Sequence, residues 1–312
     1  MDVILHIGAH RTATTTFQQY LKEQAPILTP QGFTYWGPHR TRSGLFRGLY
    51  ASGAENAASY RRAVGRVRMN VQRCRDRGRR TLFVSDENMS GAVRDNLRRE
   101  ALYPGIGTRL AQVNEGFDGK IDQVILTIRS LDLYWISALG YAVSRGHRKP
   151  NVALLDRLVT APRSWRNVIT DVACAVPSAR VRVLPFETLN GRPDAVLSAI
   201  LGAPAAPDSK DRWLNATPKL AELREISGSD RLPDGDGRWN PFDAAQSNAL
   251  REKYQDDLHW LSAGADGLAE PMAYEPHNKS HLKAGSTPPQ TDTTEGCSHD
   301  SQQGHMAPPR RE

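Results

Sequence analysis

The sequence predicts an α/β fold in which helices cover both faces of a central parallel sheet. Short runs of aliphatic and β-branched residues at 3–7, 81–85 and 123–128 have the composition of buried parallel strands. Segments with helical spacing separate these runs, and such alternation is typical of a three-layer α/β/α domain. In these folds ligands bind at the carboxyl ends of the strands. We therefore expect one domain over residues 1–262 with its site at that edge.

The first segment, residues 1–21, combines a strand, a turn and a helix. Residues 3–7 predict a buried strand, 8–12 a polar turn, and the three threonines at 14–16 open a helix. At such a junction backbone N–H groups converge, and the helix dipole adds positive potential. Arg11 adds a full charge. The segment predicts a P-loop-like turn that binds a phosphate.

This turn differs from a Walker A loop, which requires a lysine directly before a serine or threonine. Ala13 stands at the second glycine position, Thr14 stands at the lysine position, and Arg11 lies upstream. The string RTATT at 11–15 instead resembles the 5′-phosphosulfate loop of sulfotransferases that use 3′-phosphoadenosine 5′-phosphosulfate (PAPS), written K-[ST]-G-T-[TS]. It departs from that pattern in arginine for lysine and alanine for glycine.

A second strand-to-helix junction adds to the resemblance. Arg129 follows the strand at 123–128 directly, and Ser137 lies eight residues later, inside the next predicted helix at 132–145. Sulfotransferases hold the 3′-phosphate of PAPS with an arginine and a serine at this spacing. Over about residues 1–262 the chain resembles the sulfotransferase family, and most closely its bacterial, carbohydrate-type members.

The resemblance implies that PAPS is the co-substrate, without a metal, and that its sulfuryl group passes by in-line displacement to a hydroxyl of a carbohydrate or small metabolite. Arg11 would neutralise charge on the 5′-phosphate, and Arg129 with Ser137 would hold the 3′-phosphate. The 5′-phosphosulfate would lie on the loop residues Arg11, Thr12, Ala13, Thr14, Thr15 and Thr16.

Glu87 is the candidate general base for the acceptor hydroxyl. It follows the strand at 81–85 in the string SDEN, which is similar to a stretch of bacterial sulfotransferases. We expect nearby bound anions to raise its pKa toward useful base strength. The alternative is that residues 86–88 only cap a helix. His10, in the loop, is a second candidate base, whereas His6 lies within the apolar strand and is expected to be a core residue.

Two other functions remain open at this stage. One is an ATP-dependent phosphotransferase with a P-loop, although the GK[ST] string is missing. The other is a non-catalytic module that binds an anionic ligand, in which Arg11 and Ala13 mark a lost activity. The acceptor cannot be named from the sequence, because the predicted loops at 37–53 and 88–118 would form its pocket.

Composition favours an enzyme that binds a polyanionic nucleotide, since 41 Lys and Arg against 34 Asp and Glu give a net charge of +7. Cys74, Cys174 and Cys297 show no spacing typical of zinc sites or a disulfide framework. No run approaches the ~18–20 apolar residues of a membrane span, and the first strand begins at once, without a signal peptide. We expect a cytoplasmic protein.

The segment 61–80 is rich in arginine, and valines at helical spacing give it an apolar stripe. Its arginines are expected to form a solvated face, or a docking surface for an anionic glycan. Nucleic acid is not expected, because no recognised binding motif or aromatic stacking pattern accompanies them.

The remaining segments complete the prediction. Short strands are expected at 32–36 and 180–184, and further helices at 55–78, 163–175, 193–201, 217–227 and 242–262. The segment 212–217 occupies the place of a late nucleotide-binding loop, and Asn215 and Thr217 are its candidate contacts, although Thr217 is equally suited to cap the following helix. Residues 263–312 carry few aliphatic side chains, and this composition predicts a disordered tail.

Overall fold

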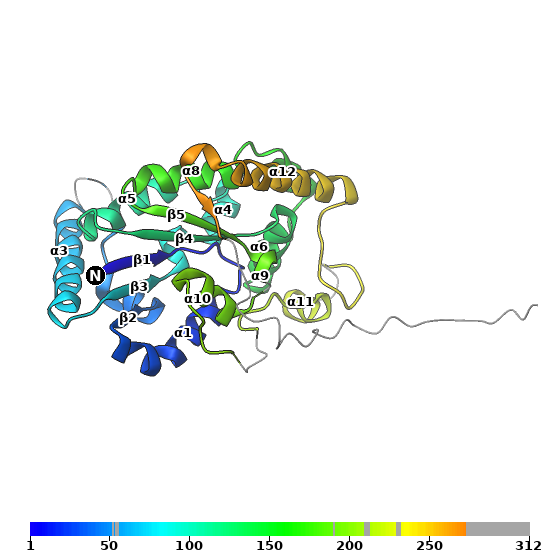
Figure 1. The fold of residues 1–312 in the computed structure, drawn as a ribbon. Helices are drawn as coiled ribbons and strands as arrows, with labels where there is room; N and C mark the ends of the chain where they lie inside the picture. Colours follow the sequence, from blue (N-terminus) through cyan, green and yellow to red (C-terminus); the bar gives the residue numbers. More distant parts are fainter. Residues whose placement is uncertain (52, 54–55, 190, 209–212, 229–231, 273–312) are drawn as a thin grey trace, which may run out of the picture. The chain divides into compact units, whose positions relative to one another are not determined.

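The computed structural model describes residues 1–272 apart from 52, 54–55, 190, 209–212 and 229–231. Within these residues, six strands form one sheet in the order β2-β3-β1-β4-β5-β6, and all neighbouring pairs are parallel (Figure 1). The predicted α/β class with a central parallel sheet is confirmed. The strands are β1 (Asp2–His6), β2 (Phe33–Trp36), β3 (Thr81–Ser85), β4 (Gln123–Ile128), β5 (Arg180–Pro185) and β6 (Glu270–Pro271).

The predicted helices are present, with ends that shift by a few residues. They are α1 (Thr14–Leu28), α3 (Ala57–Asp76), α6 (Leu131–Ser144), α8 (Trp165–Ala175), α10 (Pro193–Leu201), α11 (Leu220–Ser227) and α12 (Ala244–Ser262). Further helical segments were not predicted: α2 (Pro38–Arg40), the π-helical η2 (Thr41–Leu45), α4 (Val93–Arg99), α5 (Ile106–Gly116), α7 (Val152–Thr160), α9 (Phe186–Leu189) and the short 3₁₀ helices η1 (Thr29–Gln31), η4 (Glu87–Met89) and η6 (Ala265–Gly267).

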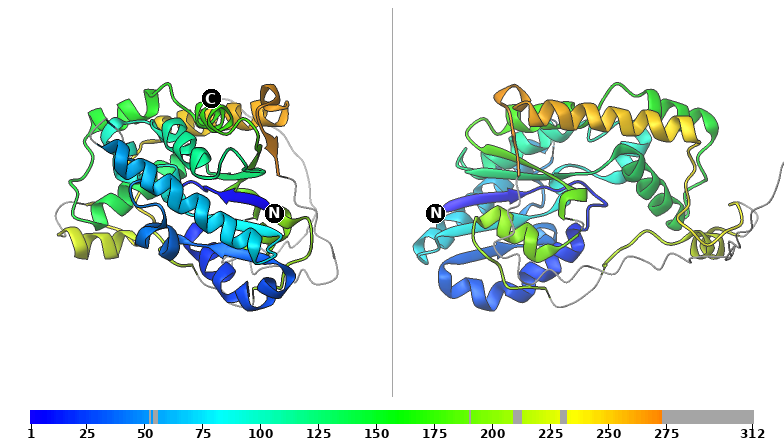
Figure 2. Two further views of the ribbon diagram at one scale, coloured as in Figure 1. Left: turned by 90° about the vertical axis from the view of Figure 1, so that its left-hand side faces the viewer. Right: turned by 45° about the vertical axis from the view of Figure 1, so that its right-hand side comes forward.

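Helices cover both faces of the sheet, as predicted. Alternate residues of a strand point to opposite faces, so that Val3 and Leu5 belong to one apolar cluster and Ile4 to the other. Side chains of α3, α5, α6, α8 and α12 complete the first cluster, and those of α1 and α10 complete the second. Figures 1 and 2 show α1 and α10 on one side of the sheet and α5, α8 and α12 on the other.

The segment expected as a variable loop at 88–118 is largely helical, and the prediction is corrected there. Its apolar residues Ile106, Leu110 and Val113 recur at helical spacing and are fully buried, so α5 covers the sheet instead of framing an open pocket. The segment 37–53 likewise contains η2, whose Leu45 is buried in the first cluster.

The fold continues beyond residue 262, where composition suggested the domain would end. Strand β6 pairs with β5, and the backbone N–H of Met272 donates to the carbonyl of Val183 at 2.8 Å. Ala265 and Met272 are buried, and their burial explains why this stretch is ordered. The rest of the predicted disordered tail lies outside the described residues.

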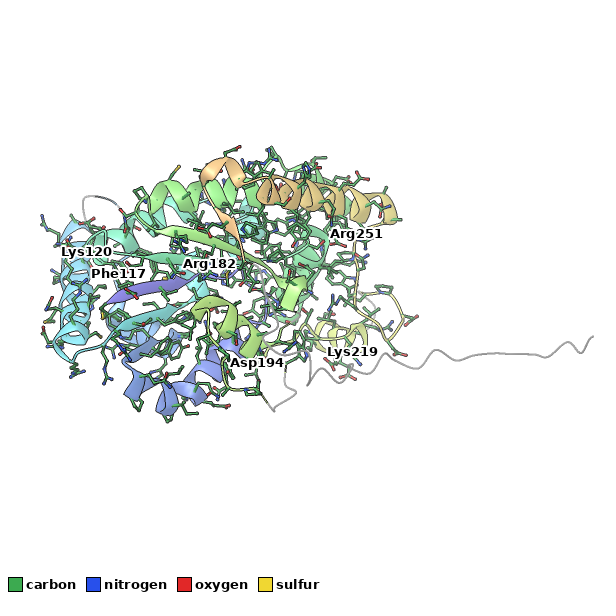
Figure 3. The ribbon with its side chains drawn as sticks, in the orientation of Figure 1. Phe117, Lys120, Arg182, Asp194, Lys219 and Arg251 are labelled. Carbon is green, nitrogen blue, oxygen red and sulfur yellow. The ribbon has the colours of Figure 1, made fainter. Side chains whose placement is uncertain are left out.

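Helix α12 fixes the elements behind the site. The carboxylate of Asp257 accepts hydrogen bonds from the Ser164 hydroxyl (2.6 Å) and the Trp165 backbone (2.9 Å) at the start of α8. The guanidinium of Arg251, labelled in Figure 3, pairs with Asp132 on α6 at 2.7 Å. Helix α6, which follows β4, and helix α8, which precedes β5, are thereby held against one long helix.

In the described part of the chain, no helix combines the length and the apolar character that a membrane span requires.

Candidate functional site

The strand order brings the predicted site segments to one edge. Strand β1 lies between β3 and β4, with His6 in register with Ser85 on one side and Ile125 on the other. Because the three strands are parallel, the turn after β1, Glu87 after β3 and Arg129 after β4 all leave the same edge of the sheet. Strands β1 and β4, which the two motifs follow, are direct neighbours in the sheet.

The turn after β1 has the backbone of an anion-binding loop. Arg11 and Ala13 both adopt left-handed conformations, with φ of 69° and 55°, which costs a residue with a side chain about 1 kcal/mol. Ala13 is the N-cap of α1 and provides no side-chain hydrogen bond. The first-turn N–H groups of an α-helix have no partner within the helix, so those of α1 remain available to an anion.

The threonines of the loop divide into two groups. Thr14 and Thr15 line the cleft at this edge. Thr12 instead donates to the carbonyl of Ala9 at 2.6 Å and is buried, while the hydroxyl of Thr16, also buried, accepts from the backbone of Leu214 at 3.1 Å. Thr12 and Thr16 therefore stabilise the conformation of the loop through internal hydrogen bonds.

The side chain of Arg11 joins the two predicted phosphate sites. Its Nε donates to the hydroxyl of Ser137 on α6 and its Nη2 to the hydroxyl of Thr217, both at 2.9 Å. These two hydroxyls also lie 2.6 Å apart. The sequence suggested separate roles for Arg11 and Ser137, whereas the structure unites them in one cluster.

Arg129 lies directly beneath this loop. Its Nη1 donates to the backbone carbonyl of Arg11 at 2.7 Å, and its own carbonyl accepts from the indole of Trp165 at 2.7 Å. The residue is 8 % exposed, and its buried Nε has no partner among the described residues. Burial, with the nearby charges of Arg238 and Arg11, lowers the pKa of Arg129 to about 10, although Glu187 opposes this. A bound anion would satisfy both the charge and the free N–H.

The segment 213–217 contacts the loop after β1, as its expected role in nucleotide binding requires. The side-chain amide of Asn215 donates to the hydroxyl of Thr15 at 3.2 Å. Helix α11 begins at Leu220 with Lys219 as its N-cap, so Thr217 is free to accept from Arg11 and is not the predicted cap. Arg212 lies outside the described residues.

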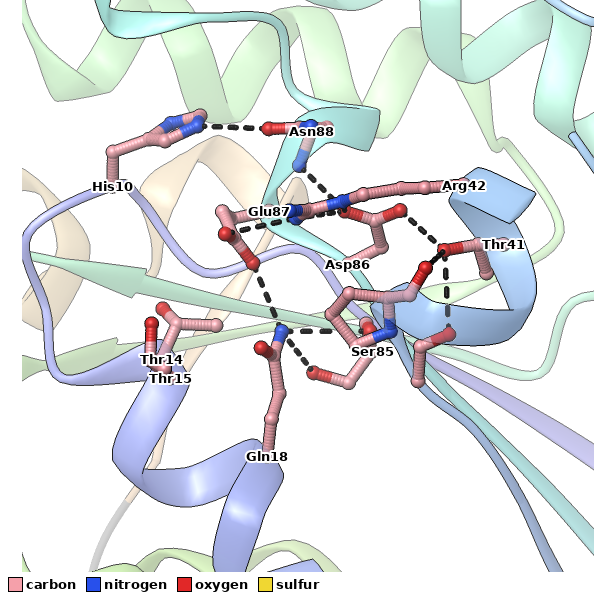
Figure 4. Close-up of polar contacts among 12 residues, drawn as sticks. His10, Thr14, Thr15, Gln18, Thr41, Arg42, Ser85, Asp86, Glu87 and Asn88 are labelled. Carbon is pink, nitrogen blue, oxygen red and sulfur yellow. Dashed lines mark hydrogen bonds and ion pairs between the residues drawn. The ribbon is translucent and has the colours of Figure 1, made fainter. Parts of the chain in front are cut away.

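Glu87 also lines the cleft, and Figure 4 shows the network of polar contacts around it. Its Oε2 accepts from the side-chain amide of Gln18 on α1 at 2.9 Å. Its Oε1 pairs with Nη2 of Arg42 at 2.9 Å, and its side chain is 14 % exposed. The neighbouring Asp86 caps η4 by accepting from the backbone of Asn88. Asp86 therefore caps η4, as the alternative interpretation predicts for this segment, whereas Glu87 lines the cleft.

The protein's own groups lower the pKa of Glu87, an effect that the expectation based on bound anions did not include. Burial raises this pKa, but the charge of Arg42 and the hydrogen bonds from Arg42 and Gln18 outweigh burial, so that the pKa lies below its ordinary value of 4.5. The prediction considered only bound anions. The sequence does not reveal Arg42 as a partner of Glu87, because this cation lies 45 residues away on η2, in a segment whose pattern predicts a polar loop.

The two histidines differ in position. His10 lines the cleft, with its Nε2 3.2 Å from Asn88 Oδ1 and its Nδ1 3.0 Å from the hydroxyl of Tyr103. Burial lowers the pKa of His10, although Glu87 opposes this. His6 is buried, packs on Phe17, and has its Nδ1 2.8 Å from the hydroxyl of Ser85. The expectation that His6 belongs to the core is confirmed.

His6 should make the fold less stable in acid. Burial lowers its pKa from 6.5 to about 4 despite the opposing charge of Glu87, so the unfolded chain binds more protons between these values. The contribution of neutral His6 to the free energy of unfolding is fully present above pH 6.5 and is lost as the pH falls toward 4. The loss reaches about 3 kcal/mol, at ~1.4 kcal/mol per pKa unit. Urea unfolding at pH 7 and 4.5 measures the loss, which should be smaller for His6→Gln. Equal pH dependence in both proteins would contradict the assignment.

The site as a whole is a cleft of about 380 Å³. Its walls carry cations, threonine hydroxyls, one carboxylate and one imidazole. It is lined by His10, Arg11, Ala13, Thr14, Thr15, Arg42, Glu87, Asn88, Ala92, Val93, Arg94, Tyr141, Leu214 and Asn215. Such a cleft is suited to bind a polyanion beside a group that accepts a proton.

Comparisons with protein-family models, with curated proteins and with solved structures found no match for this chain. The functional assignment therefore depends on the residues and contacts described above.

Proposed function

We propose that this protein is a sulfotransferase that moves the sulfuryl group of PAPS to a hydroxyl of a carbohydrate or small metabolite. The proposal rests on one observation: two strand-end motifs 118 residues apart meet, with Arg129 donating to the carbonyl of Arg11 at 2.7 Å. Arg11 in turn donates to Ser137. Arginines that converge with a helix N-terminus supply the charge and the directed donors that a nucleotide with two phosphate groups requires.

The residues at this edge would divide the work of binding. The N-terminus of α1, with Thr14 and Thr15, would hold the 5′-phosphosulfate. The 3′-phosphate would lie against Arg129 and the hydroxyls of Ser137 and Thr217, which lie behind the cleft lining and would exchange their bonds to Arg11 for bonds to the phosphate. When bound, PAPS supplies the sulfuryl group and a phosphate as the leaving group.

Glu87 would take the proton of the acceptor. As the acceptor oxygen bonds to sulfur, the bond from sulfur to the bridging oxygen breaks, the acceptor proton passes to the carboxylate, and 3′,5′-bisphosphoadenosine (PAP) leaves. The lowered pKa of Glu87 keeps the carboxylate ionised at neutral pH, at the cost of some base strength. Arg11 and the N-terminus of α1 would offset negative charge that develops on the leaving phosphate.

Replacing Arg42 with alanine should move the pH profile. The change removes the cation that lowers the pKa of Glu87 while burial remains, so this pKa should rise. The acid limb of kcat/KM should lie below pH 4.5 in the parent and at higher pH in Arg42→Ala, since only the ionised carboxylate accepts a proton. Arg47→Ala, at an exposed position next to the same segment, serves as the control. An unmoved limb would mean that Glu87 is not the titrating base.

Thermal unfolding with ligands tests the proposal directly. At a concentration near 100 Kd, PAP should stabilise the fold by about 2.7 kcal/mol and raise the Tm more than ATP with Mg²⁺ does. A larger effect of ATP with Mg²⁺ would favour the phosphotransferase instead. Binding of PAP without PAP release from PAPS, over a panel of hydroxylated sugars and phenols, would favour a non-catalytic anion-binding module.

A further inference from the structure

A second, cationic groove lies beside the candidate site, along the edge strand of the sheet. It has a volume of about 440 Å³ and runs between α1 and α3 over β2. All the charged side chains that line it are cationic: Lys22, Arg40, Arg73, Arg77 and Arg79. Cations gathered in a hollow repel one another and attract anions from solution.

Three of these charges have no partner among the described residues. Lys22, Arg73 and Arg77 make no ion pair or side-chain hydrogen bond there, whereas Arg40 donates to Asn70 (3.0 Å) and Arg79 to the carbonyl of Thr29 (2.8 Å). Arg73 lies in the last turn of α3 and Arg77 is the C-cap of this helix, and both residues are exposed. Their donors therefore face solvent in the groove and are available to a ligand.

A further hollow shares lining residues with both the groove and the candidate active-site cleft. It has a volume of about 560 Å³ and shares Lys22, Tyr35 and Arg40 with the groove. It also shares Thr15 and Leu214 with the cleft that contains Glu87. From Thr15, at the start of α1, to Thr29, its C-cap, these hollows extend over about 21 Å at ~1.5 Å per helical residue. A single sugar or phenol would not fill them.

We propose that this groove binds the anionic groups of an acidic oligosaccharide whose acceptor hydroxyl reaches Glu87. The link to Glu87 rests on the function proposed above. An acidic oligosaccharide carries both repeated anions, for Arg73, Arg77 and Lys22, and free hydroxyls for the transfer.

A single-stranded nucleic acid fits the groove less well. Proteins that bind single strands stack bases on exposed aromatic rings. Trp36, which lines the groove, is fully buried, and the guanidinium of Arg40 lies 4.8 Å from its ring centre. Tyr35 is only partly exposed, and its hydroxyl contacts the backbone of Gln18 at 3.5 Å.

The arginines of α3 are not equivalent, which provides a matched control. Arg66 donates to the carbonyl of Leu45 and Arg68 to that of Glu115, so both serve the fold. Arg61 and Arg62 are on the same helix but do not line the groove. Replacing Arg73 and Arg77, or replacing Arg61 and Arg62, lowers the net charge by the same amount. The two double variants differ only in where the charge is lost.

The test measures binding of a heparin-derived octasaccharide by calorimetry near 0.15 M salt, without nucleotide. Arg73→Ala/Arg77→Ala should weaken binding by about tenfold, given up to ~1 kcal/mol for each exposed ion pair. Arg61→Ala/Arg62→Ala should change the octasaccharide affinity by less than about threefold, because salt screens charges that lie outside the groove. PAP affinity should be the same in all three proteins.

The other outcomes are distinct. Equal losses in the two double variants would overturn the groove and indicate a diffuse basic surface. Tighter binding of an oligonucleotide of equal charge, with the same dependence on Arg73 and Arg77, would replace the oligosaccharide by nucleic acid. PAP binding without octasaccharide binding overturns the groove and leaves the sulfotransferase proposal standing. The reverse result supports the groove and overturns the proposed reaction.

Discussion

Glu87→Gln should lower kcat by about 10²–10⁴-fold, the range of general-base contributions, and leave PAP affinity nearly unchanged. The amide keeps the size of the side chain and retains an oxygen for the Gln18 amide or the Arg42 guanidinium, but it takes no proton. The loss should extend to kcat/KM, because the interaction belongs to the transition state. PAP release from PAPS, over a panel of hydroxylated acceptors, gives the rate.

Glu252→Gln is the matched control, since it makes the same change at an exposed position on α12 and should retain full turnover. Parental turnover in Glu87→Gln would end the proposal for this carboxylate and direct attention to His10, which lines the same cleft. Loss of PAP binding in Glu87→Gln would show instead that Glu87 organises the loop through Gln18.

Arg129→Ala should weaken PAP by about 2–3 kcal/mol, the cost of losing a charge-assisted contact, or roughly 30- to 150-fold in Kd. The variant removes a buried cation with a free Nε and also the donor to the carbonyl of Arg11. Arg11→Ala should have a similar effect, because its guanidinium joins Ser137 and Thr217. Calorimetry with PAP at fixed salt measures both.

Arg98→Ala, which removes an exposed arginine paired with Asp95, controls for the change in net charge. Arg129→Lys keeps the charge without the forked donor and should recover part of the affinity, which separates ligand binding from a general loosening of the loop. If both alanine variants bind PAP as tightly as the parent, the site is elsewhere.

The local pattern of apolar and polar residues is sufficient to predict most strands and helices of the fold. Unbroken apolar runs are stable as strands only when both faces are covered, so β1, β3, β4 and β5 were predicted within one or two residues. The helices missed at 88–118 had a readable signal in Ile106, Leu110 and Val113. Glycines and polar residues surround these positions, and they weaken the helical pattern.

The sequence by itself determined which groups leave the strand ends: the loop with Arg11, the carboxylate of Glu87 and the guanidinium of Arg129. Those positions depend on strand boundaries, which short-range periodicity reveals.

Only the tertiary structure decided which of these groups meet and in what electrostatic state. The partners of Arg11 lie 126 and 206 residues away, and Arg42 comes from 45 residues before Glu87. No local spacing encodes such contacts, because sheet order and helix packing create them. The direction of the Glu87 pKa shift depends on such a contact, because the packing of η2 against the end of β3 brings the Arg42 cation to within 2.9 Å of this carboxylate.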